Sequence, residues 1–194
     1  MNHYLLLIDR ISAWSGKAFA WTVLMLTLVV CYDVGLRYIL NSPTQWGFDI
    51  SYILFGTLFM MAGAYTLSRN GHVRADMIYR TLPPRTQAWF DLVLYVVFFV
   101  PGIAALAYAG IEFANVSLAM REVSSVTSSE VPIYPFKMVI PVAGFLLLLQ
   151  GFAEIARCIV CIRTGSWPQR LQDVEEEDVD QIKELLADGK SGGA

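Results

Sequence analysis

This 194-residue sequence contains only three cysteines and two histidines, which are common nucleophiles and metal ligands. Cys158 and Cys161 are separated by two residues, which is the spacing of a thiol redox pair or of one half of a metal site. The two histidines, His3 and His72, lie far from them in the sequence, and there is no second cysteine pair. We therefore expect both thiols to pack against other residues and to take no part in redox or metal chemistry.

Some ionisable residues are spaced so that they can pair within a helix. Asp33 and Arg37 are four residues apart, and Glu154 and Arg157 are three apart. Side chains at these spacings are neighbours on a helix, so each acid can neutralise its base. Solvation or pairing with a lipid headgroup is the alternative for each charge. Gln150 precedes Glu154 by one turn, and these two side chains can hydrogen bond either within this chain or with a partner.

The elements that must position these residues are long apolar runs. Hydrophobic residues make up 56% of the sequence and charged residues 16%, and the mean hydropathy is +0.51, which excludes an ordinary water-soluble composition. A helix needs about 20 residues to cross the hydrocarbon core of a membrane. The sequence therefore predicts an all-α integral membrane protein with four transmembrane helices, at about residues 18–36, 50–67, 92–111 and 135–162.

Shorter segments flank this predicted membrane domain, which covers residues 18–163. Residues 1–17 place Leu7, Ile11 and Trp14 at helical spacing. This pattern predicts either an amphipathic helix in the membrane interface or an extension of the first span. Residues 164–194 hold eight acidic and three basic residues, and we interpret them as an acidic cytoplasmic tail.

The distribution of positive charge predicts the orientation of the four spans. Eleven of the 14 Lys and Arg residues lie in the N-terminal segment, the central loop and the C-terminal region, whereas three lie in the other two loops. Positive residues are enriched on the cytoplasmic side of membrane proteins. We therefore expect both termini and the central loop to face the cytoplasm.

Small residues and prolines indicate how the helices pack. In membranes, small residues let helix backbones approach closely, and proline removes a backbone donor and bends a helix. Pro101 and Pro141 are expected to bend the third and fourth spans. The predicted packing positions are Gly56 and Gly63 in the second span, Gly144 and Gly151 in the fourth, and the pairs Ala105–Ala109 and Gly110–Ala114 in the third.

The interiors of the predicted spans hold no Asp, Glu, Lys, Arg or His. Pathways for ions or solutes through a membrane normally contain such groups near the midplane, and a buried haem needs an axial ligand. The pattern therefore indicates an accessory membrane subunit without a solute pathway of its own.

Several short motifs are more specific than the general pattern of four spans. Residues 37–43 (RYILNSP) precede Trp46 and Asp49, and further motifs lie at residues 63–67, 70–76, 82–85, 135–137, 140–141 and 146–154. Together they resemble the small membrane subunit (DctQ type) of tripartite ATP-independent periplasmic (TRAP) transporters. The resemblance covers about residues 10–163.

The resemblance implies a non-catalytic role in the bacterial inner membrane. A TRAP transporter is a sodium-coupled importer of organic acids with three proteins: a periplasmic substrate-binding protein (DctP type), a large membrane subunit (DctM type) and the small subunit. The large subunit is expected to hold the transport and sodium sites, so this chain is expected to bind no cofactor or metal. The small subunit is expected to be a scaffold for the large one.

With this orientation, two groups of residues become candidate contacts. Asn41 and its neighbours also suit an ordinary turn, and His72, Arg74 and Asp76 on the cytoplasmic side also suit contacts with lipid headgroups. The candidates for the periplasmic partner are Arg37, Asn41, Trp46, Asp49, Arg121 and Glu130. The candidates for the large subunit or lipid are His72, Arg74, Asp76, Lys137, Gln150 and Glu154.

A membrane-anchor subunit of a quinone-linked oxidoreductase is the alternative function. That alternative predicts a soluble flavoprotein partner or a bound haem. A large multi-span partner would favour the transporter subunit.

Overall fold

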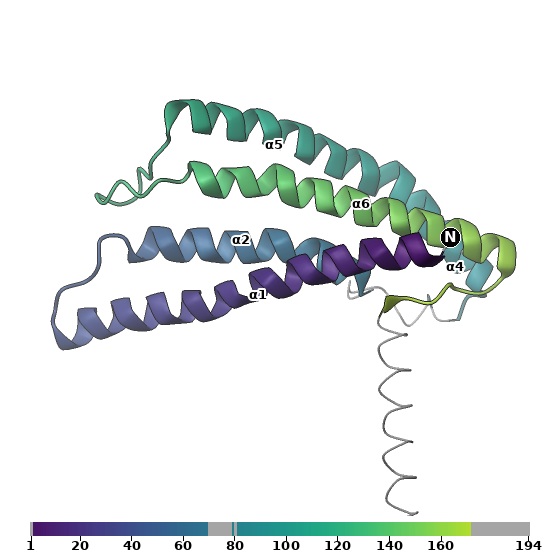
Figure 1. Ribbon diagram of the computed structural model, residues 1–194, viewed down its shortest axis with the longest axis horizontal. Coiled ribbons are helices and arrows are strands. Elements are labelled where there is room, and N and C mark those ends of the chain that lie inside the picture. Colours follow the sequence, from purple (N-terminus) through teal and green to yellow (C-terminus); the bar gives the residue numbers. More distant parts are fainter. Residues whose placement is uncertain (1, 70–78, 80, 172–194) are drawn as a thin grey trace, which may run out of the picture.

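The computed structural model describes residues 2–69, 79 and 81–171, and this part of the chain is built from long helices (Figure 1). The elements are α1 (Asn2–Ile39), α2 (Gly47–Ser68), α4 (Pro84–Leu94), the π-helical turn η1 (Tyr95–Phe99), α5 (Val100–Met120) and α6 (Tyr134–Thr164). Because α4, η1 and α5 are continuous, the described residues contain four helices that are long and apolar enough to cross a membrane. The predicted all-helical fold with four candidate spans is confirmed.

The first helix begins well before the first predicted span. Residues 2–17 and 18–36 belong to the same helix, whose 38 residues extend about 57 Å. Leu7, Ile11 and Trp14 are exposed, whereas Asp9 and Ser12 are buried. The apolar stripe in this segment therefore points away from the rest of the chain, and the polar stripe faces the neighbouring helices.

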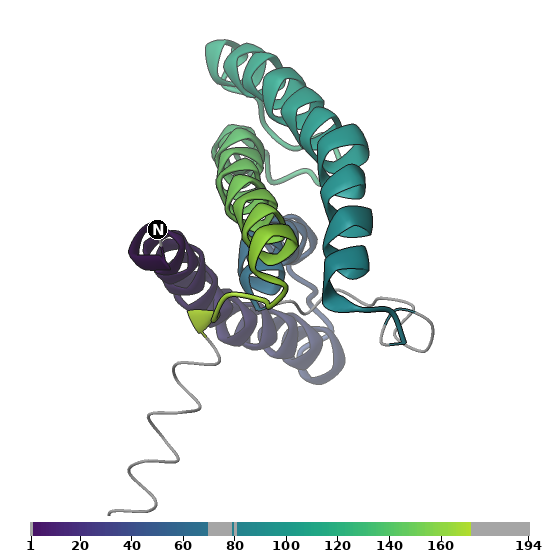
Figure 2. The same ribbon diagram turned by 90° about the vertical axis from the view of Figure 1, so that its right-hand side faces the viewer.

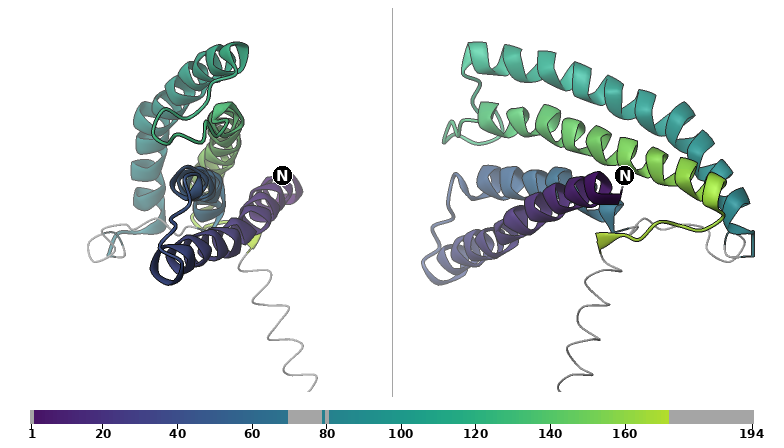
Figure 3. Two further views of the ribbon diagram at one scale, coloured as in Figure 1. Left: turned by 90° about the vertical axis from the view of Figure 1, so that its left-hand side faces the viewer. Right: turned by 45° about the vertical axis from the view of Figure 1, so that its right-hand side comes forward.

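The helices form an open array in which α6 has a central place (Figure 2). The strongest packing is between α1 and α2 and between α5 and α6, and α6 also packs against α2 and, less extensively, α1. The views in Figure 3 show α5 at the edge of the array, where α6 is its main neighbour among the long helices. One side of α5 is therefore left without a covering helix from the described part of the chain.

Glycines provide the close approaches between helices, as predicted. A Cβ atom placed on Gly144 would lie 3.0 Å from the Cβ atom of Ala107, so α5 and α6 nearly touch there. Gly110 and Ala114 are buried against α6, but Ala105 and Ala109 are exposed and meet no helix of the described chain. The other predicted glycines face side chains of neighbouring helices: Gly56 faces Phe136, Gly63 faces Leu147 and Gly151 faces Phe99.

The π-helical turn η1 lies just before Pro101. The N–H group of Val100 donates to the carbonyl of Tyr95, five residues earlier, and Pro101 has no N–H group to continue the regular helical pattern. Figure 2 shows that the continuous helix from α4 to α5 is curved. This agrees with the expected bend at Pro101. Pro141 lies inside α6, which continues through it.

The main apolar core lies where α4 packs against the last turns of α6. It includes Leu67, Ala88, Tyr95, Cys158 and Cys161. Both thiols are free and buried, so the expectation that they pack in the protein is confirmed. Gly165 ends α6 with a positive φ of 83°, a conformation that glycine adopts at little cost.

Candidate functional site

Polar and charged groups gather at the two ends of the helix array. One end, which we call the N-terminal end, contains the start of α1, the end of α2, the start of α4 and the end of α6. The opposite end contains the end of α1, the start of α2, the end of α5 and the start of α6. Between these ends, residues 18–32, 50–68, 92–111 and 138–153 contain no Asp, Glu, Lys, Arg or His.

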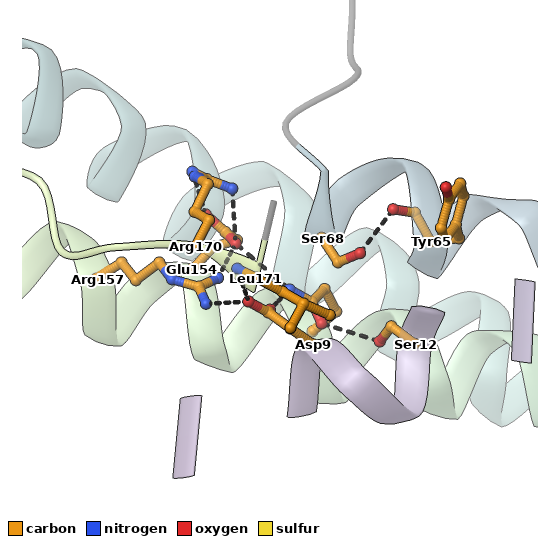
Figure 4. Close-up of polar contacts among 9 residues, drawn as sticks. Asp9, Ser12, Tyr65, Ser68, Glu154, Arg157, Arg170 and Leu171 are labelled. Atoms are coloured by element: carbon orange, nitrogen blue, oxygen red, sulfur yellow. Dashed lines mark hydrogen bonds and ion pairs between the residues drawn. The ribbon is translucent and has the colours of Figure 1, made fainter. Parts of the chain in front are cut away.

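At the N-terminal end, Arg157 of α6 lies between two carboxylates (Figure 4). Its Nη2 atom is 2.5 Å from Oδ2 of Asp9, and its Nη1 atom is 2.5 Å from Oε1 of Glu154. The Arg157 and Asp9 side chains are both 0% exposed. The charge of Asp9 in α1 is therefore neutralised by Arg157 in α6, 148 residues away in the sequence.

Amide and hydroxyl groups extend this buried network. Gln150 Nε2 donates to Oδ1 of Asp9 at 2.9 Å, and its Oε1 accepts a hydrogen bond from Ser12 Oγ at 2.9 Å. Gln150 Nε2 also lies 3.4 Å from Oε1 of Glu154. Gln150 and Glu154 are thus hydrogen bonded within this chain, which is one of the two arrangements that the sequence left open.

The segment after α6 folds back to complete the cluster. Arg170 Nη2 is 2.9 Å from Oε2 of Glu154, so this carboxylate receives two guanidinium groups. The backbone N–H of Leu171 points to Oδ2 of Asp9 at 3.4 Å. Asp9, Glu154, Arg157 and Arg170 together carry two negative and two positive charges. We call these residues, with Ser12 and Gln150, the buried charge cluster.

Sequence reasoning missed the part that α1 plays in the buried charge cluster. Asp9 lies off the apolar stripe of residues 1–17, and nothing in the sequence links it to residues near position 157. A signal was present, however. Asp9, Ser12 and Gly16 are three or four residues apart and form a small and polar stripe, which is typical of a helix that packs inside a membrane protein.

At the opposite end, Asp33 holds the loop between α1 and α2. Its carboxylate accepts a hydrogen bond from the backbone N–H of Thr44 at 2.9 Å and a second from the Thr44 hydroxyl. Arg37 Nη2 donates to the other carboxylate oxygen at 2.8 Å. The pair that was predicted from the four-residue spacing is therefore formed.

Asp49 connects α2 with the loop between α5 and α6. Its side chain accepts hydrogen bonds from Ser124 Oγ, at 2.7 Å, and from the Thr127 hydroxyl. Asp49 is only 4% exposed, because these loop residues cover it. Its contacts in the described chain are intramolecular, and a contact with a periplasmic partner stays a prediction.

The same loop is attached to α6 by an ion pair. Lys137 Nζ is 2.5 Å from Oε2 of Glu122 and lies 4.0 Å from the centre of the Phe113 ring. The hydrogen bond from Lys137 lowers the pKa of Glu122 below its ordinary value of 4.5. Backbone pairing between Ser124 and Val131, at 2.8 Å, also orders the loop.

The remaining predicted contact residues differ in their accessibility. Trp46 is 37% exposed and stacks against Tyr32 with a centroid distance of 6.1 Å. Lys137 is mostly covered by its own contacts. His72, Arg74 and Asp76 lie outside the described residues. The predicted periplasmic contacts that are exposed are Arg37, Asn41, Arg121 and Glu130, and the last three lie in turns with positive φ.

The fold and its two polar ends define a class of protein: a multi-pass membrane protein that keeps its charged groups out of the middle of its spans. Within the described residues, no three His, Cys, Asp or Glu side chains are grouped as metal ligands would be.

A sequence model of one protein family, the DctQ component of tripartite ATP-independent periplasmic transporters, matches residues 26–161. The chain therefore belongs to that family. It is therefore a non-catalytic small permease subunit of the bacterial inner membrane. A similar protein is the sialic acid TRAP transporter small permease protein SiaQ of Vibrio cholerae. It is 23% identical over 130 residues, which are 67% of this chain and 72% of the relative. Membership of this family decides against the alternative function, a membrane-anchor subunit of a quinone-linked oxidoreductase.

Proposed function

We propose that this chain is a scaffold for the large membrane subunit and helps to dock a periplasmic substrate-binding protein during sodium-coupled import of an organic acid. The observation that carries this proposal is the uncharged middle of all four spans. A charged substrate and a coupling ion need polar groups near the midplane. A TRAP transporter must then hold those groups in another protein, which is the large subunit.

The proposed orientation places the N-terminal end in the cytoplasm. The positive-inside count supports this, because the segments rich in Lys and Arg adjoin that end. The fold brings them together: Asp9 near the N-terminus binds Arg157 near the end of α6, and Cys161 approaches the carbonyl of Pro84 at the start of α4. The opposite end then faces the periplasm.

The periplasmic end offers a surface for the substrate-binding protein. Arg37, Arg121 and Glu130 are exposed there and carry charges of both signs. Exposed charges of this kind act mainly on the rate of encounter and on the register of binding. The name of the Vibrio cholerae relative refers to sialic acid, which is an organic acid, and this supports the proposed class of substrate.

Co-purification tests the scaffold function. The affinity-tagged chain, produced together with the DctM-type subunit, should retain that subunit through purification in mild detergent. As a control, the large subunit is produced without the tagged small subunit, which shows whether it is retained on its own. Retention of a haem or a flavoprotein in place of a multi-span partner would overturn the proposal.

A further inference from the structure

One face of α5 has no covering helix in the described chain. The side of α5 toward α6 contains Gly110, Ala114 and Ser117, which are buried. The opposite side contains Ala105, Tyr108, Glu112 and Asn115, at successive spacings of three or four residues, and all four are exposed. We call these four residues, with Ala109, the outer α5 face.

The composition of the outer α5 face differs from that of the other exposed faces. Lipid tails are best matched by large apolar side chains, whereas small and polar side chains are typical of contacts between membrane helices. The exposed parts of α1 and α2 carry large apolar residues such as Leu24, Leu28, Phe55 and Phe59. The outer α5 face carries two alanines, an amide and a carboxylate, and its one large side chain, Tyr108, has a polar hydroxyl group.

Glu112 is the unusual member of this face. No residue that the structure describes forms a hydrogen bond or ion pair with its carboxylate, and Lys137, which lies against the ring of the next residue Phe113, is paired with Glu122. Glu112 lies eight residues inside the end of α5, which is about 12 Å along the helix. A carboxylate at such a position is costly unless a partner supplies a positive charge or hydrogen-bond donors.

The surface beside Glu112 is also hollowed. An open hollow of about 310 Å³ is lined by Ala109, Glu112, Phe113 and Val116. The small side chain of Ala109 leaves room there for a side chain of a neighbouring helix. A side chain that enters this hollow would lie next to the Glu112 carboxylate.

We propose that the outer α5 face binds a transmembrane helix of the large membrane subunit, and that this helix supplies an Arg or Lys side chain to Glu112. The inference rests on the proposed scaffold function and adds the contact surface. A second copy of this chain fits the surface less well. A twofold dimer through this face would bring two Glu112 carboxylates together, and like charges disfavour such an arrangement.

Co-purification of face variants with the DctM-type subunit tests this surface. Ala105→Leu combined with Ala109→Leu should lower the retained large subunit at least about tenfold, because the added side chains block close helix approach. Glu112→Lys should have a similar effect through its reversed charge. Ala18→Leu combined with Ala20→Leu changes exposed alanines of α1 and is the matched control. The isolated variants should elute and unfold like the wild-type chain, since the outer α5 face buries nothing within it.

Photo-crosslinking identifies the occupant of the face. The residue p-benzoylphenylalanine at Tyr108, which is 77% exposed, should form an adduct with the large subunit. The same residue at Trp21 of α1 should not. Normal retention of the large subunit by all α5 variants, or an adduct between two copies of this chain alone, would overturn the inference and leave the scaffold function standing. Failure of the wild-type chain to retain the large subunit would overturn both.

Discussion

Arg157 is a buried cation whose charge is balanced by neighbouring carboxylates. It is fully buried and contacts carboxylates from two different helices. Removing one member of a buried ion pair leaves the other charges uncompensated, which costs far more than the net contribution of the pair. The buried charge cluster therefore specifies how α1 and the segment after α6 are attached to the array.

Replacement of this arginine gives the first prediction. Arg157→Met should lower the free energy of unfolding of the purified chain in detergent by about 3–5 kcal/mol, because Asp9 and Glu154 lose their buried guanidinium partner. Chemical unfolding followed by circular dichroism measures the change. Arg163→Met, an exposed change in the same helix, should cost less than about 0.5 kcal/mol. Equal effects of the two changes would show that the cluster does not stabilise the fold.

The Glu122–Lys137 pair gives a prediction about pH. The pKa of Glu122 is lowered in the folded chain, so the unfolded chain takes up a proton more readily as the pH falls. The contribution of the pair is present above the ordinary value of 4.5 and is lost as the pH falls through the lower pKa of the folded state. The stabilities of the wild type and of Glu122→Gln should therefore differ at pH 7 and converge below pH 4.5. A difference that is constant with pH would contradict this assignment.

At the residue scale, local pairs were predictable and distant ones were not. Asp33 and Arg37 lie four apart in one helix, so their ion pair follows from helix geometry alone. The partner of Asp9 depends on the packing of α1 against α6, which no local spacing encodes. The hydrogen bonds of Asp49 could not be predicted for the same reason, since the loop that covers it lies 75 residues further along the sequence.

At the scale of the elements, close contact between α1 and α2 depends on Gly16. A Cβ atom at this position would lie 2.4 Å from the Cβ atom of Tyr65 in α2, which is shorter than any tolerable contact. The two helices must therefore move apart if Gly16 is enlarged. Gly35, in the same helix, has no atom within 4 Å of the corresponding position.

These two glycines form a matched pair for mutation. Gly16→Ala should destabilise the chain by about 1–3 kcal/mol through overpacking. Gly35→Ala should be neutral or stabilising by up to about 1 kcal/mol, because alanine is the better helix former and meets no obstacle. Unfolding in detergent checks both values. If Gly16→Ala is as stable as Gly35→Ala, α1 and α2 do not approach as closely as described.

The helices themselves were largely predictable because hydropathy alone marks a membrane span. The runs at residues 50–67, 92–111 and 135–162 lie inside the helices Gly47–Ser68, Pro84–Met120 and Tyr134–Thr164. The extent of α1 was harder to predict, since Asp9 and Lys17 interrupt the apolar pattern that a span requires. The exposed Ala105–Ala109 pair shows a further limit, because small residues at helical spacing do not always pack against a helix of the described chain.

At the scale of the whole molecule, labelling tests the orientation. Ser42→Cys and Ser128→Cys at the opposite end should react with a membrane-impermeant thiol reagent in intact spheroplasts, whereas Ser166→Cys at the N-terminal end should not. All three serines are exposed, so accessibility is matched, and a Cys31→Ser background removes the exposed native thiol. If Ser166→Cys reacted and the other two variants did not, the orientation would be the opposite of the proposed one.

The central claim is that this chain supports transport without forming the pathway. Residues 18–32, 50–68, 92–111 and 138–153 of its spans carry no charged group, and it belongs to the DctQ family of small permease subunits. Such a chain has nothing at the membrane midplane to bind a charged solute or a sodium ion. The proposed function therefore assigns that site to the large subunit.

Uptake by proteoliposomes tests this claim most directly. Vesicles with the chain alone should take up no organic acid under an inward sodium gradient. Vesicles with the chain, the DctM-type subunit and the substrate-binding protein should take it up, and omission of the chain should abolish or strongly reduce the rate. Sodium-driven uptake by the chain alone, or full activity without it, would contradict the account.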